Sequence, residues 1–184
     1  VDGNSALHAD FHTITSWPGQ PTHVWVGNDG GVFRSDDSGD HWISVNSNLQ
    51  LTQFEQCDLH PSDPHLAYGG TQDNGTWQTP GNPVKWENTM IGDGGQSGFD
   101  VANPAFRFHT FFDAQPDVNF SSGDMADWNW IGDPFFVPPG NAENRSFYIP
   151  IITDPVVSKS MFAGLTHVWR TKTWGMGSMS LDDF

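Results

Sequence analysis

Three residues near the start of the chain, His8, Asp10 and His12, alternate in a pattern that suits metal binding. On a β-strand, residues two apart project from the same face, so these side chains would converge. Two imidazoles and a carboxylate are an adequate ligand set for zinc, manganese or iron, and calcium is a further candidate. Asp29 or Asp73, from adjoining turns, is expected to supply another oxygen to the metal. The pattern predicts a divalent-metal site or, alternatively, a polar strand whose histidines are only hydrogen-bonded.

Glycines flank three aspartates, Asp29, Asp73 and Asp93, as is typical of loops that bind ligands. Glycine neighbours let a ligand approach the backbone closely. A sugar site needs carboxylates that accept hydroxyl hydrogen bonds or act as acid and base, so we predict these three as catalytic candidates. The adjacent Asn28 and Gln72 are predicted to bind the ligand. The structural alternative is that these residues only cap backbone N–H groups in tight turns.

Aromatic side chains are plentiful and include nine Trp, whose faces can stack on sugar rings. Trp77 and Trp169 follow the same spacing as Phe33 in a repeat described below, so we expect them to pack in a core. Trp130 has no counterpart in that repeat. We therefore predict it as an exposed, ligand-binding residue.

The acidic composition narrows the choice of partner. The formal net charge is −15, and it arises from 19 Asp and only three Glu. Asp is a turn and cap residue, so the negative charge is expected mostly in loops. Such a surface repels phosphate backbones, which argues against nucleic acid and favours a glycan or another neutral polar ligand. No apolar run approaches the roughly 20 residues needed to cross a bilayer, so no membrane partner is expected.

A hydroxyl residue followed seven positions later by Trp recurs along the chain. The pairs are Ser35 with Trp42, Thr79 with Trp86, and Ser121 with Trp128; a weaker fourth start at Thr171 lacks the distal Trp. The first copy is a complete Ser-x-Asp-x-Gly-x-x-Trp hairpin, in which Asp caps turn N–H groups and Gly permits a positive φ.

Each repeat is expected to contain four short strands. Its length of about 45 residues is that of one propeller blade. We therefore predict an all-β fold of about four antiparallel blades, forming one propeller segment over 1–184 with repeats near 5–45, 46–90, 91–140 and 141–184. Four blades would leave sheet edges exposed, so the ring is expected to be completed by a longer chain or by a homodimer.

The chain resembles the BNR (Asp-box) β-propeller superfamily, and most closely bacterial members described as glycosyl hydrolases. The resemblance rests on the segments His8–His12, Asn28–Val32 and Gly70–Gly75, and it covers residues 5 to about 100 best. It implies a propeller fold and carbohydrate chemistry. Sialidases of this superfamily bind a carboxylate through three arginines and carry an Arg-Ile-Pro signature. This chain has four Arg in total and no such signature, so it departs from the sialidases. The catalytic Asp pair of the xyloglucanase-type members is not assignable by motif.

Two classes of function stay open at this point. One is glycoside hydrolysis by Asp carboxylates at the central pore; the other is a non-catalytic propeller that binds a glycan or a protein. A serine-nucleophile elbow, a phosphate-binding loop and a dinucleotide fingerprint are all absent from the sequence. The single cysteine, Cys57, excludes an intrachain disulfide. The residues do not fix the compartment, and our expectation is an extracellular or periplasmic location.

Overall fold

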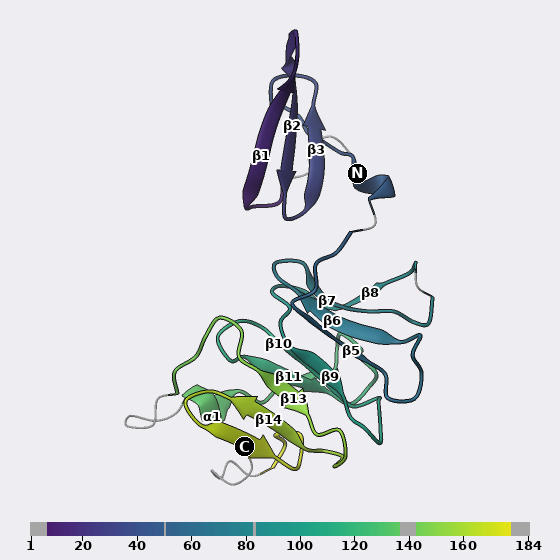
Figure 1. Ribbon diagram of the computed structural model, residues 1–184, viewed down its shortest axis with the longest axis vertical. Helices are drawn as coiled ribbons and strands as arrows, with labels where there is room; N and C mark the ends of the chain where they lie inside the picture. Colours follow the sequence, from purple (N-terminus) through teal and green to yellow (C-terminus); the bar gives the residue numbers. More distant parts are fainter. Residues whose placement is uncertain (1–6, 50, 83, 137–142, 178–184) are drawn as a thin grey trace. The chain divides into compact units, whose positions relative to one another are not determined.

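A computed structural model describes residues 7–49, 51–82, 84–136 and 143–177 (Figure 1). It consists of antiparallel strands with one short 3-10 helix and one short α-helix. The elements are β1 Phe11–Trp17, β2 Gln20–Asn28, β3 Gly31–Ser35, β4 Ile43–Ser44, η1 Asn46–Asn48, β5 Gln56–Leu59, β6 Ala67–Thr71, β7 Gly75–Gln78, β8 Glu87–Met90, β9 Ser97–Phe99, β10 Arg107–Thr110, β11 Pro116–Asn119, β12 Trp128–Trp130, α1 Asp133–Phe136, β13 Ile151–Thr153, β14 Met161–Gly164 and β15 Val168–Thr171.

The strands form four sheets, each built from strands consecutive in sequence: β1–β4, β5–β8, β9–β12 and β13–β15. All pairings are antiparallel, and within the described residues the last sheet has three strands and no sheet closes on itself. The predicted all-β fold of four-stranded antiparallel units is confirmed. No helix in the described ranges is long and apolar enough to cross a membrane.

The chain divides into two compact units, Val1–Thr52 and Gln53–Phe184. The first unit is the sheet β1–β4. Its buried side chains come from β2 and β3, where Val26 is 2% and Phe33 8% exposed. Every residue of β1 is exposed, including the apolar Phe11 and Ile14. This sheet therefore buries the residues of its central strands and leaves apolar side chains of β1 uncovered.

The second unit contains the other three sheets and the main hydrophobic core. The core is made of alternating residues from neighbouring strands, because every second side chain of a strand points to the same face. Its fully buried members include Phe108 of β10, Val118 of β11, Ile151 of β13 and Met161 of β14. Trp174, which follows β15, is 1% exposed and packs into the same cluster.

A hydrogen-bonded hairpin follows β3. The Ser35 hydroxyl oxygen accepts hydrogen bonds from the backbone N–H groups of Asp37 (3.3 Å) and Gly39 (2.8 Å). Asp37 in turn accepts from the backbone N–H of His41 at 2.9 Å. This backbone bond, with the side chains of His41 and Ser35, lowers the pKa of Asp37 to about 2. Gly39 has a φ of +103°, which explains why glycine stands there.

The same turn recurs in the third and fourth sheets, and in the third it begins two residues earlier than the sequence predicts. Asn119 accepts hydrogen bonds through Oδ1 from the N–H groups two and four residues on, at Ser121 and Gly123. The hydroxyl oxygen of Thr171 likewise accepts hydrogen bonds from the N–H groups two and four residues on, at Thr173 and Gly175. The predicted equivalence of Ser121 with Ser35 is thus wrong by two residues. An amide oxygen replaces the hydroxyl, so a search for Ser or Thr misses it.

The connections of the first two sheets of the second unit gather at two ends. The β6–β7 turn, the β8–β9 connection and the β10–β11 turn form what we call the Asp73 end. Here the Gly94 N–H donates to Thr71 O and the Gly95 N–H to Thr110 O, both at 2.8 Å. The β5–β6, β7–β8, β9–β10 and β11–β12 connections form the opposite end, which we call the Thr79 end.

Candidate functional site

The segment of His8, Asp10 and His12 is not one continuous strand. Strand β1 begins at Phe11, so only His12 lies in it. Asp10 has a φ of +57°, in the left-handed region, which interrupts the extended backbone on which a common face depends. His8 lies before this break, with Nδ1 3.2 Å from the carbonyl oxygen of Ala9.

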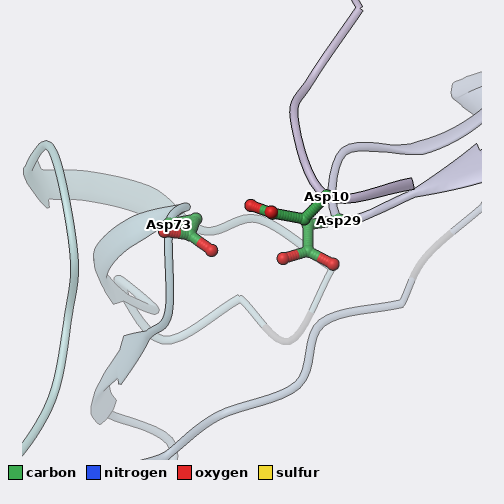
Figure 2. Close-up of side chains that lie close together, drawn as sticks. All are labelled: Asp10, Asp29 and Asp73. Atoms are coloured by element: carbon green, nitrogen blue, oxygen red, sulfur yellow. The ribbon is translucent and has the colours of Figure 1, made fainter. Parts of the chain in front are cut away.

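The first unit nevertheless brings three potential ligands together. The carboxylate oxygens of Asp10 and Asp29 lie within 4.8 Å of each other (Figure 2). The Nε2 atom of His12 is hydrogen-bonded to Oδ1 of Asp29. Two carboxylates and one imidazole suit zinc or manganese, and the metal site stays a prediction. The potential metal ligands that the first unit brings together are therefore Asp10, His12 and Asp29, whereas the sequence predicted His8, Asp10 and His12.

Asn28 is engaged within the first unit. Its Nδ2 donates to the carbonyl oxygen of His8 at 2.8 Å, and its Oδ1 accepts from the N–H of Gly30 at 3.0 Å. The residue is only 7% exposed. The amide therefore ties the segment before β1 to the β2–β3 turn, and its predicted contact with a ligand stays a prediction.

In the second unit, the fold joins two of the predicted aspartates. Asp73 lies in the β6–β7 turn with a φ of +60° (Figure 2), and its backbone N–H donates to Oδ1 of Asp93 at 3.2 Å. The turn that carries Asp73 can approach the segment that carries Asp93 because glycines pack backbone against backbone between them. A Cβ atom at Gly70 would lie 2.2 Å from the carbonyl oxygen of Gly95. Gln72, beside Asp73, is exposed at the same turn.

Tyr148 is a member of this region that the sequence did not indicate. Burial, followed by the negative charges of Asp93, Glu55 and Asp73, raises the pKa of its phenol. Its hydroxyl is shielded from solvent and has no hydrogen-bond partner among the described residues. The phenol therefore stays neutral and lies in the field of three carboxylates. Ser146-Phe147-Tyr148 follows no repeat motif, so only tertiary structure reveals this position.

Two exposed phenylalanines extend the same surface. Phe112 is 40% and Phe147 52% exposed, and their rings stack with centroids 5.4 Å apart and an interplanar angle of 17°. Phe147 also packs edge-on against Tyr148 at 4.9 Å. The Asp73 end thus combines carboxylates with an exposed aromatic platform.

Trp130 is exposed, as predicted for a contact residue, at 43%. It pairs with Asp117 across β11 and β12, and its Nε1 donates to Asp133 Oδ1 at 2.6 Å. Its ring packs beside Phe136 at 5.9 Å. Neighbours thus fix one edge of the indole while part of the ring faces solvent.

The arrangement at the Asp73 end can recognise a polar ring. The carboxylates of Asp73 and Asp93 can accept hydrogen bonds from hydroxyl groups of a ligand. Flat aromatic faces offer apolar contact with low loss of side-chain entropy. We call Asp73, Asp93, Phe112, Phe147 and Tyr148 together the Asp73–Tyr148 surface.

Comparison with known proteins identifies the fold. No protein-family model matches the chain, and no curated protein sequence matches it. Among solved structures, an ancestral GH74 enzyme aligns with a TM-score of 0.52 at 13% identity, over 89% of this chain and 23% of its own. The GH74 enzyme of Niastella koreensis aligns with a TM-score of 0.51 at 15% identity, over 95% of this chain and 24% of its own. The chain spans about a quarter of these proteins, and what it shares with them is the β-propeller fold.

Proposed function

We propose that the chain is part of an Asp-box β-propeller that recognises carbohydrate at the Asp73–Tyr148 surface. The observation that carries the proposal is the hydrogen-bonded approach of Asp73 and Asp93 beside Tyr148 and a stacked pair of exposed phenylalanines. Carboxylates next to flat aromatic faces fit the alternating hydroxyl and C–H surfaces of a sugar ring.

The Asp-box assignment is supported by the hairpin after β3. Its Ser35, Asp37 and Gly39 make the turn hydrogen bonds expected of the motif, and equivalent turns occur at Asn119 and Thr171. Each of these turns follows β3, β11 or β15, and so lies at the opposite end of that strand from the β2–β3, β10–β11 or β14–β15 turn. We therefore assign these turns a structural role and place recognition at the Asp73 end.

The more specific version of this proposal is that the protein hydrolyses a glycoside. Asp73 and Asp93 would serve as the acid and base, or as acid and nucleophile, of a two-carboxylate mechanism. The alternative is recognition without turnover, with both carboxylates acting only as hydrogen-bond acceptors. The sequence resemblance to glycosyl hydrolases motivates the enzyme, and the shared propeller fold is compatible with both.

A glycan array combined with a panel of chromogenic glycosides tests the proposal. Asp73→Asn and Asp93→Asn keep an oxygen acceptor but remove the charge. Each should weaken glycan binding about ten-fold or more, since hydrogen bonds to charged groups contribute roughly 1.5–3 kcal/mol. If the protein is a glycosidase, turnover should fall by about a hundred-fold or more.

Asp63→Asn is the matched control, because Asp63 also caps a turn, through the N–H of His65 at 3.0 Å, but lies at the Thr79 end. It should bind like the wild type. The proposal fails if no glycan binds, or if the Asp73 and Asp93 variants bind as well as the Asp63 variant. Binding without turnover of any glycoside would assign the non-catalytic form.

We also propose that the first unit binds a divalent metal through Asp10, His12 and Asp29. The support is the proximity of the two carboxylates and the hydrogen bond from His12 to one of them. Calorimetric titration with zinc and manganese should show one site per chain, and Asp29→Asn should weaken it about ten-fold or more. Asp40→Asn, an exposed Asp in the hairpin after β3, serves as control. Equal affinity of both variants, or no saturable binding, would contradict the site.

A further inference from the structure

A cavity of about 280 Å³ opens at the Thr79 end of the second unit, away from the Asp73–Tyr148 surface. It lies where the sheets β5–β8 and β9–β12 meet. Its walls come from all four connections at this end and from the adjoining strands: His60, Leu66, Ala67, Gln78, Thr79, Pro80, Phe99, Pro104, Ala105, Arg107 and Ser122. Among the described residues, none that lines the cavity carries a carboxylate, although the chain contains 19 Asp.

Arg107 brings a buried positive charge to this cavity. The residue is 6% exposed, and its guanidinium lies 4.9 Å from the centroid of the Phe99 ring. Nη1 donates to Gln78 Oε1, and Nη2 donates to the carbonyl oxygen of Pro104 at 2.9 Å. Its Nε–H has no hydrogen-bond partner within the described part of the chain. Both partners of the guanidinium are neutral.

An ionised side chain out of water is costly unless a counter-charge or a full set of hydrogen bonds compensates it. Burial is the main influence on the pKa of Arg107 and lowers it, and the nearby Tyr68 opposes this. A guanidinium has five N–H donors, so donors remain beyond the two bonded groups. The site is thus electrostatically incomplete and open to an anion.

His60 supplies a second donor. Its Nδ1 accepts hydrogen bonds from the backbone N–H groups of Ser62 at 3.3 Å and Asp63 at 3.1 Å. A nitrogen that accepts from N–H groups carries no proton, so the proton of the neutral ring is on Nε2. The ring is held edge-on against Phe99, with centroids 5.4 Å apart. These contacts fix the tautomer that carries its proton on Nε2, and His60 is one of the residues that line the cavity.

We propose that this cavity binds a small oxyanion, a carboxylate or a phosphate, with Arg107 as the charged partner and His60 as a second donor. A guanidinium fork matches the geometry of both groups. The volume suits a small ligand rather than an extended chain, being just below the range of sites for drug-sized molecules. An oxyanion would supply the counter-charge that the lining lacks.

Calorimetric titration of the full chain with sodium phosphate, sodium sulfate and sodium acetate tests the proposal, with sodium chloride at equal ionic strength as reference. Comparison of the affinities for phosphate and acetate distinguishes a phosphate ligand from a carboxylate ligand. We expect saturable one-to-one binding of at least one of them. Arg107→Gln should weaken it about ten-fold or more, and His60→Phe, which keeps the ring but not the donor, about three-fold or more.

Arg170→Gln is the matched control, because Arg170 is an exposed arginine that packs over Phe162 in the last sheet. It should bind like the wild type. In case Arg107→Gln does not fold, the Nε–H resonance of Arg107 in the ¹⁵N-labelled wild type gives an independent reading, since it should shift on titration. Failure of all three oxyanions to bind, unchanged affinity in a folded Arg107→Gln, or an unmoved Arg107 resonance would overturn the proposal.

Discussion

His109 is fully buried on β10 among aromatic rings, edge-on to Phe111 at 4.7 Å and Trp128 at 4.6 Å. Its Nδ1 lies 3.4 Å from the Thr76 hydroxyl, and its Nε2 lies 3.5 Å from Asp117 Oδ2. Burial lowers the pKa of His109, and the opposing influence of Asp117 does not cancel this. The native protein therefore holds His109 neutral, whereas the unfolded chain protonates it at about pH 6.5.

This difference makes stability depend on pH. Below about pH 6.5 the unfolded state binds more protons, so the free energy of unfolding should fall as the pH drops toward the lowered native pKa. Each unit of pKa difference is worth about 1.4 kcal/mol. Urea denaturation monitored by Trp fluorescence, at about pH 7.5 and about pH 5.5, measures the effect. The free energy of unfolding should fall between the two pH values in the wild type, and should fall less in His109→Gln. Equal losses in both proteins would contradict the neutral, buried assignment.

At the level of single residues, the sequence predicts the turns that contain Asp73 and Asp93 but not their approach to Tyr148, and their role in binding or catalysis stays a prediction. Asp73 and Asp93 were indicated by turn sequences, whose local geometry requires Gly and Asp. Tyr148 approaches them from a distant part of the chain, and nothing within its own segment reflects that contact. Alternating residues imply a strand only if every φ stays extended, so the sequence pattern does not reveal the break in the backbone at Asp10.

At the level of elements, Asp100 joins the third sheet to the fourth. It follows β9, is 2% exposed, and accepts hydrogen bonds from the N–H of Lys159 at 2.6 Å and from Trp174 Nε1 at 3.2 Å. Burial alone would raise its pKa, but the N–H groups of Lys159, Asn103 and Ala102 outweigh burial and lower it. The ionised carboxylate is therefore part of the folded structure.

Asp100→Asn should lower the free energy of unfolding by about 2–4 kcal/mol, because buried N–H donors lose a charged acceptor. Because the native pKa is lowered, the ionised group contributes its stability above about pH 3.9 and loses it as the pH falls through the native value. The variant should thus lose less stability in acid than the wild type. Asp154→Asn, at an exposed turn capping Val156 and Val157, is the control and should unfold nearly as the wild type does. Equal effects of the two changes on denaturant midpoints would refute the role of Asp100.

The repeat of short strands was predictable, because alternating apolar residues between Gly-rich and Asp-rich turns favour antiparallel hairpins. The register of the third repeat was not. Asn119 makes with its amide oxygen the bonds that Ser35 makes with its hydroxyl, so a pattern of hydroxyl-to-Trp spacing selects Ser121 instead. Hydrogen-bonding geometry, rather than residue type, defines the equivalent position.

At the level of the whole molecule, the chain covers 23% and 24% of the length of the two propeller enzymes that it resembles in fold. The first unit leaves Ile14 71%, Trp17 57% and Phe11 57% exposed on β1. Apolar side chains of a single sheet are normally buried against a packing partner. We propose that further blades, from a longer polypeptide or a second copy, complete the ring.

The 184-residue chain by itself is therefore expected to self-associate. Light scattering coupled to size-exclusion chromatography should give at least twice its mass of 20.4 kDa. Ile14→Lys should shift the equilibrium toward the monomer, whereas a change at a position that is already polar, such as Thr15→Lys on the same exposed strand, should not. A stable monomer at every concentration would rule out closure of the ring by a second copy.

The central claim, carbohydrate recognition at the Asp73–Tyr148 surface, is tested most directly by backbone amide shifts in the ¹⁵N-labelled protein. The titrant is the oligosaccharide that binds best on the array. The account predicts that the largest shifts fall at Asp73, Gly94, Gly95 and Phe147, and that the amides of Thr79 and Ser122 stay in place. Shifts that centre on the Thr79 end, or the absence of any saturable shift, would contradict it.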